Sequence, residues 1–200
     1  MALLNILFVT EDLVVGGAQV FALRLAQALS KEHNVHLFCY LEDLIIHDIV
    51  RNNAPGVKLL TYRPLGGGLL RLIDRMLYKL KVDLCVYNMF VNRQIKRYLR
   101  DLKIDIVHSH AFKVDYELTK ILRSWRIPWI LTTHGDHAVF YRNIKNGRGE
   151  QVYNYSFKLR KILERVSFLV YLSDRQLDFI QLIGNIDWDF SSERIVKIYN

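Results

Sequence analysis

The sequence predicts an α/β fold: a Rossmann-like, doubly wound, mostly parallel sheet with helices on both faces. Short apolar runs alternate along the whole chain with segments of helical periodicity. The apolar runs are continuous, which is typical of strands that are covered on both faces. Strand, helix and strand in succession favour parallel pairing with right-handed crossovers. The length of 200 residues and an apolar fraction of 51% suit one domain, residues 1–200.

Seven segments have the length and composition of strands. They cover residues 5–10, 34–40, 57–62, 104–110, 128–134, 167–173 and 194–199. The first apolar run lacks a basic leader and is followed at once by Glu11 and Asp12. It therefore predicts a first strand and not a secretory signal.

Helical patterns fill most of the intervals between these strands. They cover residues 17–30, 43–52, 114–126, 150–165 and 174–183, with a longer helical region at 69–103. A Pro-Leu-Gly-Gly-Gly turn at 64–68 opens that longer region, which is an insertion relative to a minimal Rossmann unit.

The basic charge is concentrated in the middle of the chain. The net charge of the chain is +8. Residues 63–126 carry 14 basic and 6 acidic side chains, so the net charge of this segment equals that of the whole chain. Within 69–103 the leucines and methionines lie at helical spacing. The helices would therefore be amphipathic, with an apolar face and a basic opposite face. Such helices lie on anionic membranes, but a helix packed on the core shows the same pattern. Nucleic acid is a weaker expectation because no aromatic stacking platform is evident.

The sequence predicts a cytoplasmic protein and leaves open a peripheral association with the inner face of the cell membrane through residues 69–103. Cys39 and Cys85 lie in apolar runs without metal-ligand spacing, which favours buried thiols in a reducing compartment. No uncharged apolar stretch approaches the roughly 18 residues of a membrane span.

A glycine pair follows the first predicted strand. In a parallel sheet, ligands bind beyond the carboxyl ends of the strands. Gly16 and Gly17 lie there, at the start of a helix whose free N–H groups favour an anion. A tight turn without a ligand is the alternative. The GxGxxG fingerprint is absent, which argues against a nucleotide-dependent oxidoreductase.

Histidines follow two later strands. His108 and His110 end the fourth predicted strand and face the same side of it, and His134 and His137 follow the fifth. A zinc site is a weak alternative because Asp136 is the one nearby carboxylate. We expect hydrogen bonds from imidazole to a sugar hydroxyl or a phosphate oxygen. The polar loop 140–151 is either a substrate loop or a solvated connection.

The order of these motifs resembles the N-terminal domain of family 4 glycosyltransferases of GT-B architecture. The motifs are GGA at the first helix, DIVHSH, TTHG, VYLSD and ERIVKIYN, and they span nearly all of the chain. The resemblance implies a retaining transfer from a nucleotide-sugar donor, a co-substrate, to a glycan or lipid-linked acceptor in polysaccharide or glycolipid biosynthesis. It implies no cofactor and no bound metal.

The resemblance assigns roles to individual residues. His134 is the expected catalytic-site contact of the donor sugar. Gly16 and Gly17 match the glycine loop, and His110 lines the cleft. With them, His108, Gly135 and Asp136 are the expected substrate-binding residues. The family often has an acidic residue shortly after the glycine pair, where this chain has Gln19. A charged acceptor contact at that point is therefore in doubt.

The resemblance also implies a missing partner. In the family, a C-terminal donor-binding domain carries a basic pair and an EX7E-type motif, neither of which can be matched here. We therefore expect residues 1–200 to be an isolated acceptor-side domain, inactive without that second domain. The alternative is a non-catalytic binding module that recognises an acceptor, a membrane surface or a partner protein. Sugar, nucleotide, acceptor and oligomeric state are not predicted.

Overall fold

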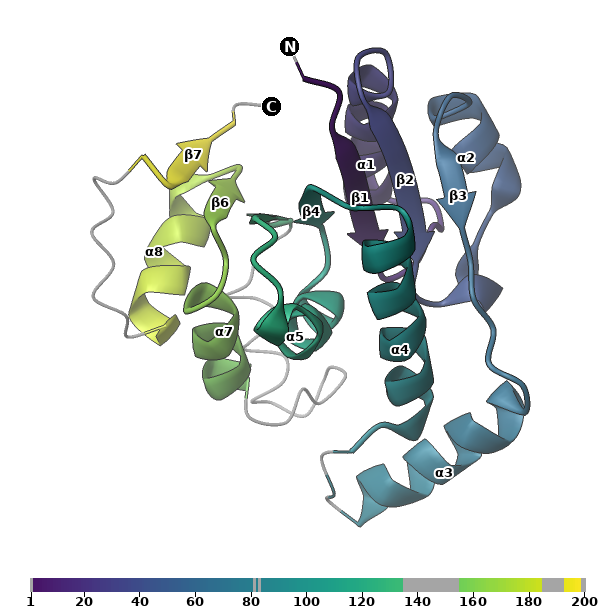
Figure 1. Ribbon diagram of the computed structural model, residues 1–200. Coiled ribbons are helices and arrows are strands. Elements are labelled where there is room, and N and C mark those ends of the chain that lie inside the picture. The colour runs from purple at the N-terminus through teal and green to yellow at the C-terminus, as the bar shows by residue number, and fades with distance from the viewer. Residues whose placement is uncertain (1, 81, 83, 135–154, 185–192, 199–200) are drawn as a thin grey trace.

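The seven predicted strands form one parallel sheet. The computed structural model describes residues 2–80, 82, 84–134, 155–184 and 193–198. The strand order is β3-β2-β1-β4-β5-β6-β7, and every neighbouring pair is parallel (Figure 1). The strands are β1 Asn5–Thr10, β2 Asn34–Cys39, β3 Lys58–Leu60, β4 Ile106–Ser109, β5 Trp129–Thr132, β6 Phe168–Tyr171 and β7 Ile195–Lys197. The predicted α/β class is confirmed.

The helices connect successive strands, as the periodicity predicts. They are α1 Gly17–Leu29, α2 His47–Asn53, α3 Gly67–Lys79, α4 Val86–Asp101, α5 Phe112–Ile121, α7 Tyr155–Leu163 and α8 Asp174–Gly184. Two short 3-10 turns, Glu42–Leu44 and Leu122–Ser124, precede α2 and follow α5. The predicted region 69–103 is two helices, α3 and α4, and the first residues of the predicted helix at 150–165 lie outside the described part.

Alternate residues of β1 build two separate cores. Leu7 and Val9 belong to a cluster with α4, α5, α7 and α8, whereas Ile6 and Phe8 belong to a cluster with α1 and α2. All four side chains are buried because both faces of this strand are covered. Continuous apolar sequence is the expected result of such burial.

The described helices cover the β5–β7 half of the sheet more completely on one face than on the other. In β6 the side chain of Leu169 is buried against the α7 and α8 core, whereas Phe168 is 41% exposed. In β7, Val196 is 44% exposed. The α1 face of these last strands is therefore more open than the face beneath α5, α7 and α8.

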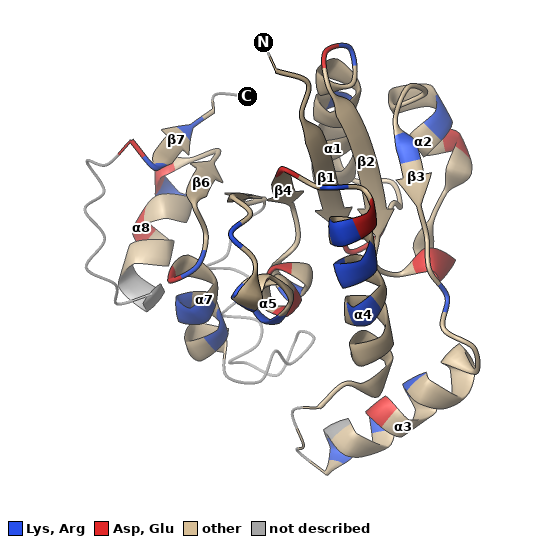
Figure 2. Cartoon of the chain, viewed as in Figure 1, with Lys and Arg blue, Asp and Glu red and all other residues tan. Residues whose placement is uncertain are grey.

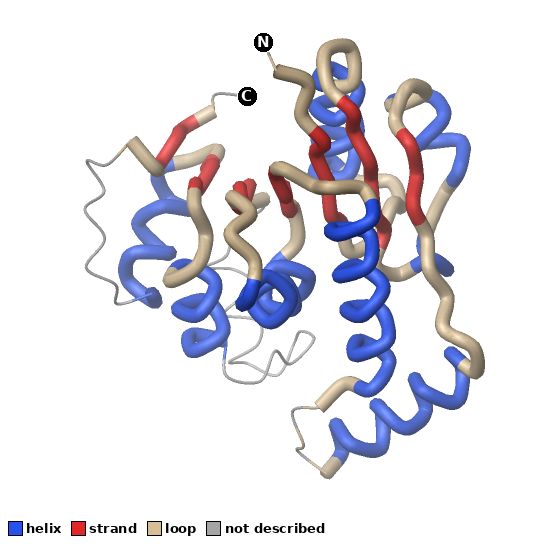
Figure 3. The backbone as a smooth tube through the Cα atoms, viewed as in Figure 1, coloured by secondary structure: helices blue, strands red, loops and turns tan. Residues whose placement is uncertain are grey.

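Helix α3 extends away from the sheet and contacts α4 (Figure 3). Asp74 of α3 holds the start of α4, because its carboxylate accepts hydrogen bonds from the backbone N–H groups of Val86 at 2.5 Å and Tyr87 at 3.1 Å. A carboxylate that caps a helix N-terminus also faces the positive end of the helix dipole. This cap links α3 to the start of α4.

The two helices of the basic region differ in what their apolar faces contact. In α4 the apolar face is buried in the core, and Lys and Arg lie on its solvated back (Figure 2). In α3 the face predicted from leucine spacing stays exposed: Leu69 is 63%, Leu72 53% and Met76 60% exposed. The core-packed alternative therefore describes α4 and not α3.

Candidate functional site

The carboxyl ends of β1 and β4 meet at the point where the sheet reverses its strand order. From β1 the chain proceeds to β2 on one side, and β4 lies on the other side. The first turn of α1 and the residues that follow β4 and β5 lie at the same edge. In doubly wound sheets this crevice is where ligands bind.

Three histidines from β4 and the end of β5 form a contiguous cluster. His110 Nδ1 lies 2.9 Å from His134 Nε2, and the rings of His108 and His110 stack with centroids 4.4 Å apart. His108 Nε2 lies 2.8 Å from Thr132 Oγ1. The predicted same-side placement of His108 and His110 is confirmed.

Two of these histidines are buried and neutral. His108 and His110 are each 6% exposed, and Phe8 packs against both rings. Burial, and to a lesser extent the charge of His134, lowers the pKa of His108 to about 3. Burial, followed by the charges of His108 and His134, also lowers the pKa of His110 well below its ordinary value. Neither ring supplies positive charge to a ligand near neutral pH.

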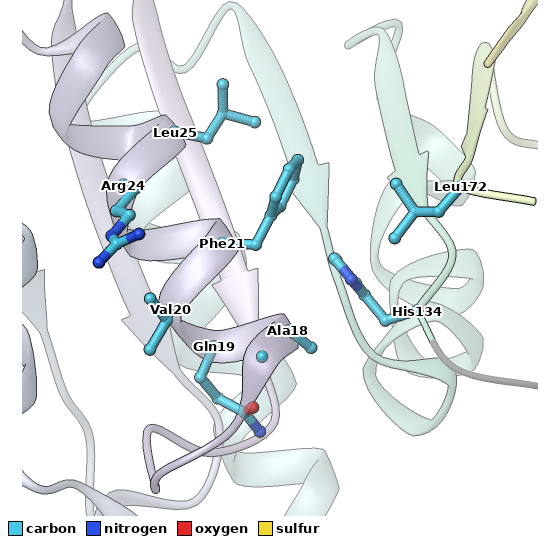
Figure 4. Close-up of a pocket in the computed structure, with 9 residues that line it drawn as sticks. Ala18, Gln19, Val20, Phe21, Arg24, Leu25, His134 and Leu172 are labelled. Atoms are coloured by element: carbon cyan, nitrogen blue, oxygen red, sulfur yellow. The ribbon is translucent and has the colours of Figure 1, made fainter. Parts of the chain in front are cut away.

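An open pocket lies between α1 and the loops that follow β5 and β6. Its volume is about 880 Å³. Figure 4 shows Phe21 and Leu25 of α1 on one side, with His134 and Leu172 facing them across the pocket. Phe21 and His134 make an edge-to-face contact with centroids 5.3 Å apart. Gly17 and Arg24 of α1 also line the pocket.

The two glycines before and within α1 have different local roles. A Cβ on Gly16 would meet Gln19 Oε1 at 2.3 Å, because the Gln19 side chain folds back over the start of the helix. Gln19 Nε2 donates to Asp12 Oδ1 at 2.7 Å, so a side chain at position 16 would displace this contact. A Cβ on Gly17 would meet nothing within 4 Å. Packing therefore does not require glycine at 17, and the open space beside it belongs to the large pocket.

A second, smaller pocket of about 90 Å³ lies between the carboxyl ends of β1 and β4. Its lining includes Thr10, Glu11, Asp12, Gln19 and His110. Ala18 and Gln19 line both pockets, so the two are neighbours along the first turn of α1.

The predicted site residues divide into three groups. Gly17 and His134 line the large pocket, and His110 lines the small one. His108 lies behind His110 and lines neither, so its hydrogen bond to Thr132 orders the cluster. Gly135, Asp136 and His137 lie outside the described residues, as does the polar loop 140–151.

Several lining residues were not predicted from the sequence. Phe21, Leu25 and Arg24 line the large pocket, and Leu172 closes it from the β6 side. The spacing of Gly17, Phe21 and Leu25 is a helical i, i+4 series, which could have indicated one face of α1. Thr10 ends β1 and carried no sequence signal beyond its place at the end of a strand.

The described residues contain no group of three or more His, Cys, Asp or Glu side chains placed to hold a metal ion. Both cysteines are free; Cys39 is buried and Cys85 is half-buried. Within the described part of the chain, no helix is long and apolar enough to cross a membrane.

Solved glycosyltransferases are among the structures similar to this chain. The chain is similar to Anabaena HepE in complex with UDP-glucose (TM-score 0.59, 14% identity, 98% of this chain and 43% of that one). It is also similar to sucrose-phosphate synthase from Thermosynechococcus elongatus (0.64, 15%, 98% and 48%) and to Acinetobacter baumannii MurG (0.60, 11%, 98% and 45%). The fold is therefore that of one domain of the GT-B class, and this chain spans less than half the length of these relatives.

The family model for Glycosyltransferase Family 4 matches residues 15–200. The chain belongs to this family, as the motif order predicted. Among curated protein sequences, none matches the chain.

The buried imidazoles predict acid sensitivity. An unfolded histidine has a pKa of about 6.5, whereas native His108 has a pKa of about 3. Between these values the unfolded chain binds a proton that the native state does not, so the free energy of unfolding should fall as the pH decreases below about 6.5. Urea unfolding at several pH values measures this dependence.

His108→Gln should make the loss of stability with acidification less steep, because it removes one of the two buried titrating rings. His47→Gln, at an exposed position on α2, is the control. Equal pH dependence in His108→Gln and wild type would contradict the assignment.

Proposed function

We propose that this domain is the N-terminal half of a retaining, nucleotide-sugar-dependent glycosyltransferase. It would transfer a hexose to a glycan or lipid-linked acceptor in polysaccharide or glycolipid biosynthesis, at the cytoplasmic face of the membrane. The observation that carries this proposal is the large open pocket between α1 and the loops after β5 and β6, with Gly17, Arg24 and His134 around it, in a member of Glycosyltransferase Family 4.

The pocket offers two kinds of support to a phosphate-bearing donor. The first turn of α1 presents N–H groups and the positive end of the helix dipole beside Gly17. Arg24 lies seven residues further along the helix, about 10 Å away at 1.5 Å per residue, and its side chain is exposed. HepE has been solved in complex with UDP and with UDP-glucose, which agrees with a nucleotide-sugar donor here.

His134 is the best-placed side chain for the donor sugar. It is half-buried, faces the pocket and is oriented by the hydrogen bond to His110 and the edge contact with Phe21. A ring held in this way can bond a sugar hydroxyl with little loss of side-chain entropy. Catalysis would consist chiefly of positioning and of stabilising the leaving diphosphate.

The proposal includes a second, donor-binding domain of the same protein. The GT-B relatives are about twice as long as this chain, and the described residues supply one exposed arginine to the large pocket. A departing nucleoside diphosphate needs more cationic support than that. Residues 1–200 alone should therefore show no transfer, and no metal is required by the proposal.

We further propose that α3 attaches the domain to an anionic membrane. Its exposed leucines and methionine form an apolar strip, and the exposed Arg75 and Lys79 lie on the same helix. Exposed arginines and lysine of α4 add to the positive surface (Figure 2). Apolar insertion combined with basic flanks is the pattern that favours anionic lipid.

Gly17→Ala should raise the stability of the domain and lower its affinity for the donor. The new methyl group enters open space, and alanine restricts the unfolded chain, so stability should rise by about 0.5 kcal/mol. The same methyl group occupies the approach to the helix N-terminus, so affinity for UDP-glucose or another accepted donor should fall several-fold. Thermal unfolding and calorimetric titration of the intact protein measure the two effects. Unchanged donor affinity would place the phosphate elsewhere.

His134→Ala should reduce transfer at least about a hundredfold, because one positioned hydrogen bond in a transition state contributes roughly 3 kcal/mol. The assay is a screen of common sugar nucleotides with the intact protein, followed by rates for the variant. His47→Ala, at an exposed histidine far from the pocket, is the matched control. Full activity of His134→Ala would remove this residue from the site. Absence of transfer with every donor would favour the non-catalytic binding module.

Leu72→Gln combined with Met76→Gln should weaken membrane binding at least about tenfold. Each large apolar side chain that enters the lipid contributes about 1.5–3 kcal/mol, and about 1.4 kcal/mol is a factor of ten. Co-sedimentation with phosphatidylcholine vesicles, with and without phosphatidylglycerol, provides the measurement. Phe157→Gln, at an exposed apolar residue of α7, is the control. Equal sedimentation of wild type with both vesicle types would contradict an anionic-membrane role.

A further inference from the structure

We infer that a pocket at the amino edge of the sheet binds a small soluble ligand in which a planar ring carries an anionic group. The pocket lies between the loop that enters β5 and the turn that follows α7, and its volume is about 420 Å³. We call it the amino-edge pocket. The inference does not depend on the proposed transferase function, because it concerns a different edge of the sheet.

The amino-edge pocket is separate from the substrate crevice. Arg123 and Trp125 precede β5, Trp129 is the first residue of β5, and Glu164 and Arg165 lie between α7 and β6. Because β5 and β6 are parallel neighbours, both strands begin at the same edge. The other two pockets lie beyond the carboxyl ends of the strands, at the opposite edge. A ligand in the amino-edge pocket would therefore leave the crevice unoccupied.

Two arginines give this pocket an excess of positive charge. Arg123 and Arg165 are exposed, and among the described residues neither guanidinium group has a hydrogen-bond or ion-pair partner. Glu164 also lines the pocket, but Lys161 Nζ lies 2.8 Å from its carboxylate and offsets its charge. A concave surface with excess positive charge attracts anions. Guanidinium groups bind phosphate and carboxylate through paired hydrogen bonds.

The end of α7 does not require the side chain of Arg165. An arginine that follows a helix often donates to the carbonyl groups at the helix end. Here Arg194 has a comparable role, because its guanidinium group donates to Val166 O at 2.7 Å and to Ser167 O at 3.0 Å. Ile162 O accepts from the backbone N–H groups of Arg165 and Val166, each at 3.0 Å. The guanidinium group of Arg165 thus remains available to a ligand.

The apolar part of the pocket offers a flat surface. Trp125 and Ile127 are half-buried and pack against the core. Trp129 is buried, and its ring is held in place because Nε1 donates to Ser109 Oγ at 2.7 Å. Aromatic faces bind planar rings by stacking. A ligand that combines a ring with an anionic group would contact Trp125 and the arginines together.

The size of the pocket favours a small molecule over a protein partner. Small-molecule sites have volumes of about 300–1,000 Å³, and the amino-edge pocket lies within this range. A stable protein interface needs about 800 Å² on each partner. Aromatic phosphates, such as nucleoside monophosphates, and aromatic carboxylates share the required chemistry, and the experiment distinguishes between them.

The test is a titration of the protein with UMP and with benzoate, followed by NMR. The indole N–H signal of Trp125, assigned by its loss in Trp125→Phe, should shift with at least one of these two anions. Ribose 5-phosphate lacks the ring and uridine lacks the charge. Both should therefore bind at least about tenfold more weakly than UMP if the phosphate is the preferred anion, and benzoate should bind more tightly than acetate if the carboxylate is preferred.

Three variants assign the contacts. Arg123→Gln and Arg165→Gln should each lower the affinity for the preferred anion about tenfold, because hydrogen bonds to charged groups are the stronger ones. Trp125→Leu should remove the advantage of the ringed anion over its ringless counterpart. Arg51→Gln is the matched control, since Arg51 is an exposed arginine of α2, beside the other end of the sheet.

Three results would overturn the inference. One is an unshifted Trp125 signal with both ringed anions, which includes binding of UMP in the substrate crevice alone. Another is equal affinity for the ringed anions and for their ringless or uncharged counterparts. The third is an affinity that Arg123→Gln and Arg165→Gln leave unchanged. None of these results bears on sugar transfer, so the transferase proposal is tested independently.

Discussion

Pairing between β1 and β4 is the constraint on which the whole site depends. It fixes Phe8 opposite His108 and Val9 opposite Ser109, so the residues that follow both strands emerge side by side. Because the pairing is parallel, both strands end at the same edge, and the turn into α1 starts there too. A shift of this register by one residue would place Thr10 and His110 on opposite faces of the sheet. This alignment therefore brings together the glycine turn, His110 and the small pocket, and the β4–β5 pairing adds His134 to the cluster.

Burial of the histidine cluster decides what kind of chemistry this half of the site can perform. His108 and His110 pack against Phe8 and stay neutral, so their function is to orient and to hydrogen-bond. Positive potential comes instead from the first turn of α1 and from Arg24, which both lie beside the large pocket. The first turn of α1 thus lies beside two pockets of different charge. Glu11 and Asp12 line the small one, whereas Arg24, about two turns along the helix, lines the large one.

The sequence predicted the fold almost completely and the site in part. Continuous apolar runs located all seven strands because strands buried on both faces need apolar side chains at every position. Motif order located Gly17, His110 and His134, which follow strands. Thr10 and Leu172 were missed because their significance comes from which strands are neighbours, and strand order is not encoded in any local pattern. Arg24 and Phe21 were missed because periodicity predicts which residues share a face of α1. It does not predict whether that face lies against the core, a pocket or solvent.

Helix α3 also shows that periodicity does not predict what an apolar helix face contacts. Its apolar spacing is as regular as that of α4, yet the helix extends away from the sheet, so its apolar strip remains exposed. Figure 1 shows that β1, β2 and β3 point toward the end of the molecule where α3 lies. A membrane bound by α3 would thus lie nearer to the carboxyl-end edge than to the opposite edge. The apolar strip of α3 and the pockets at the carboxyl ends of the strands therefore lie toward the same end of the sheet.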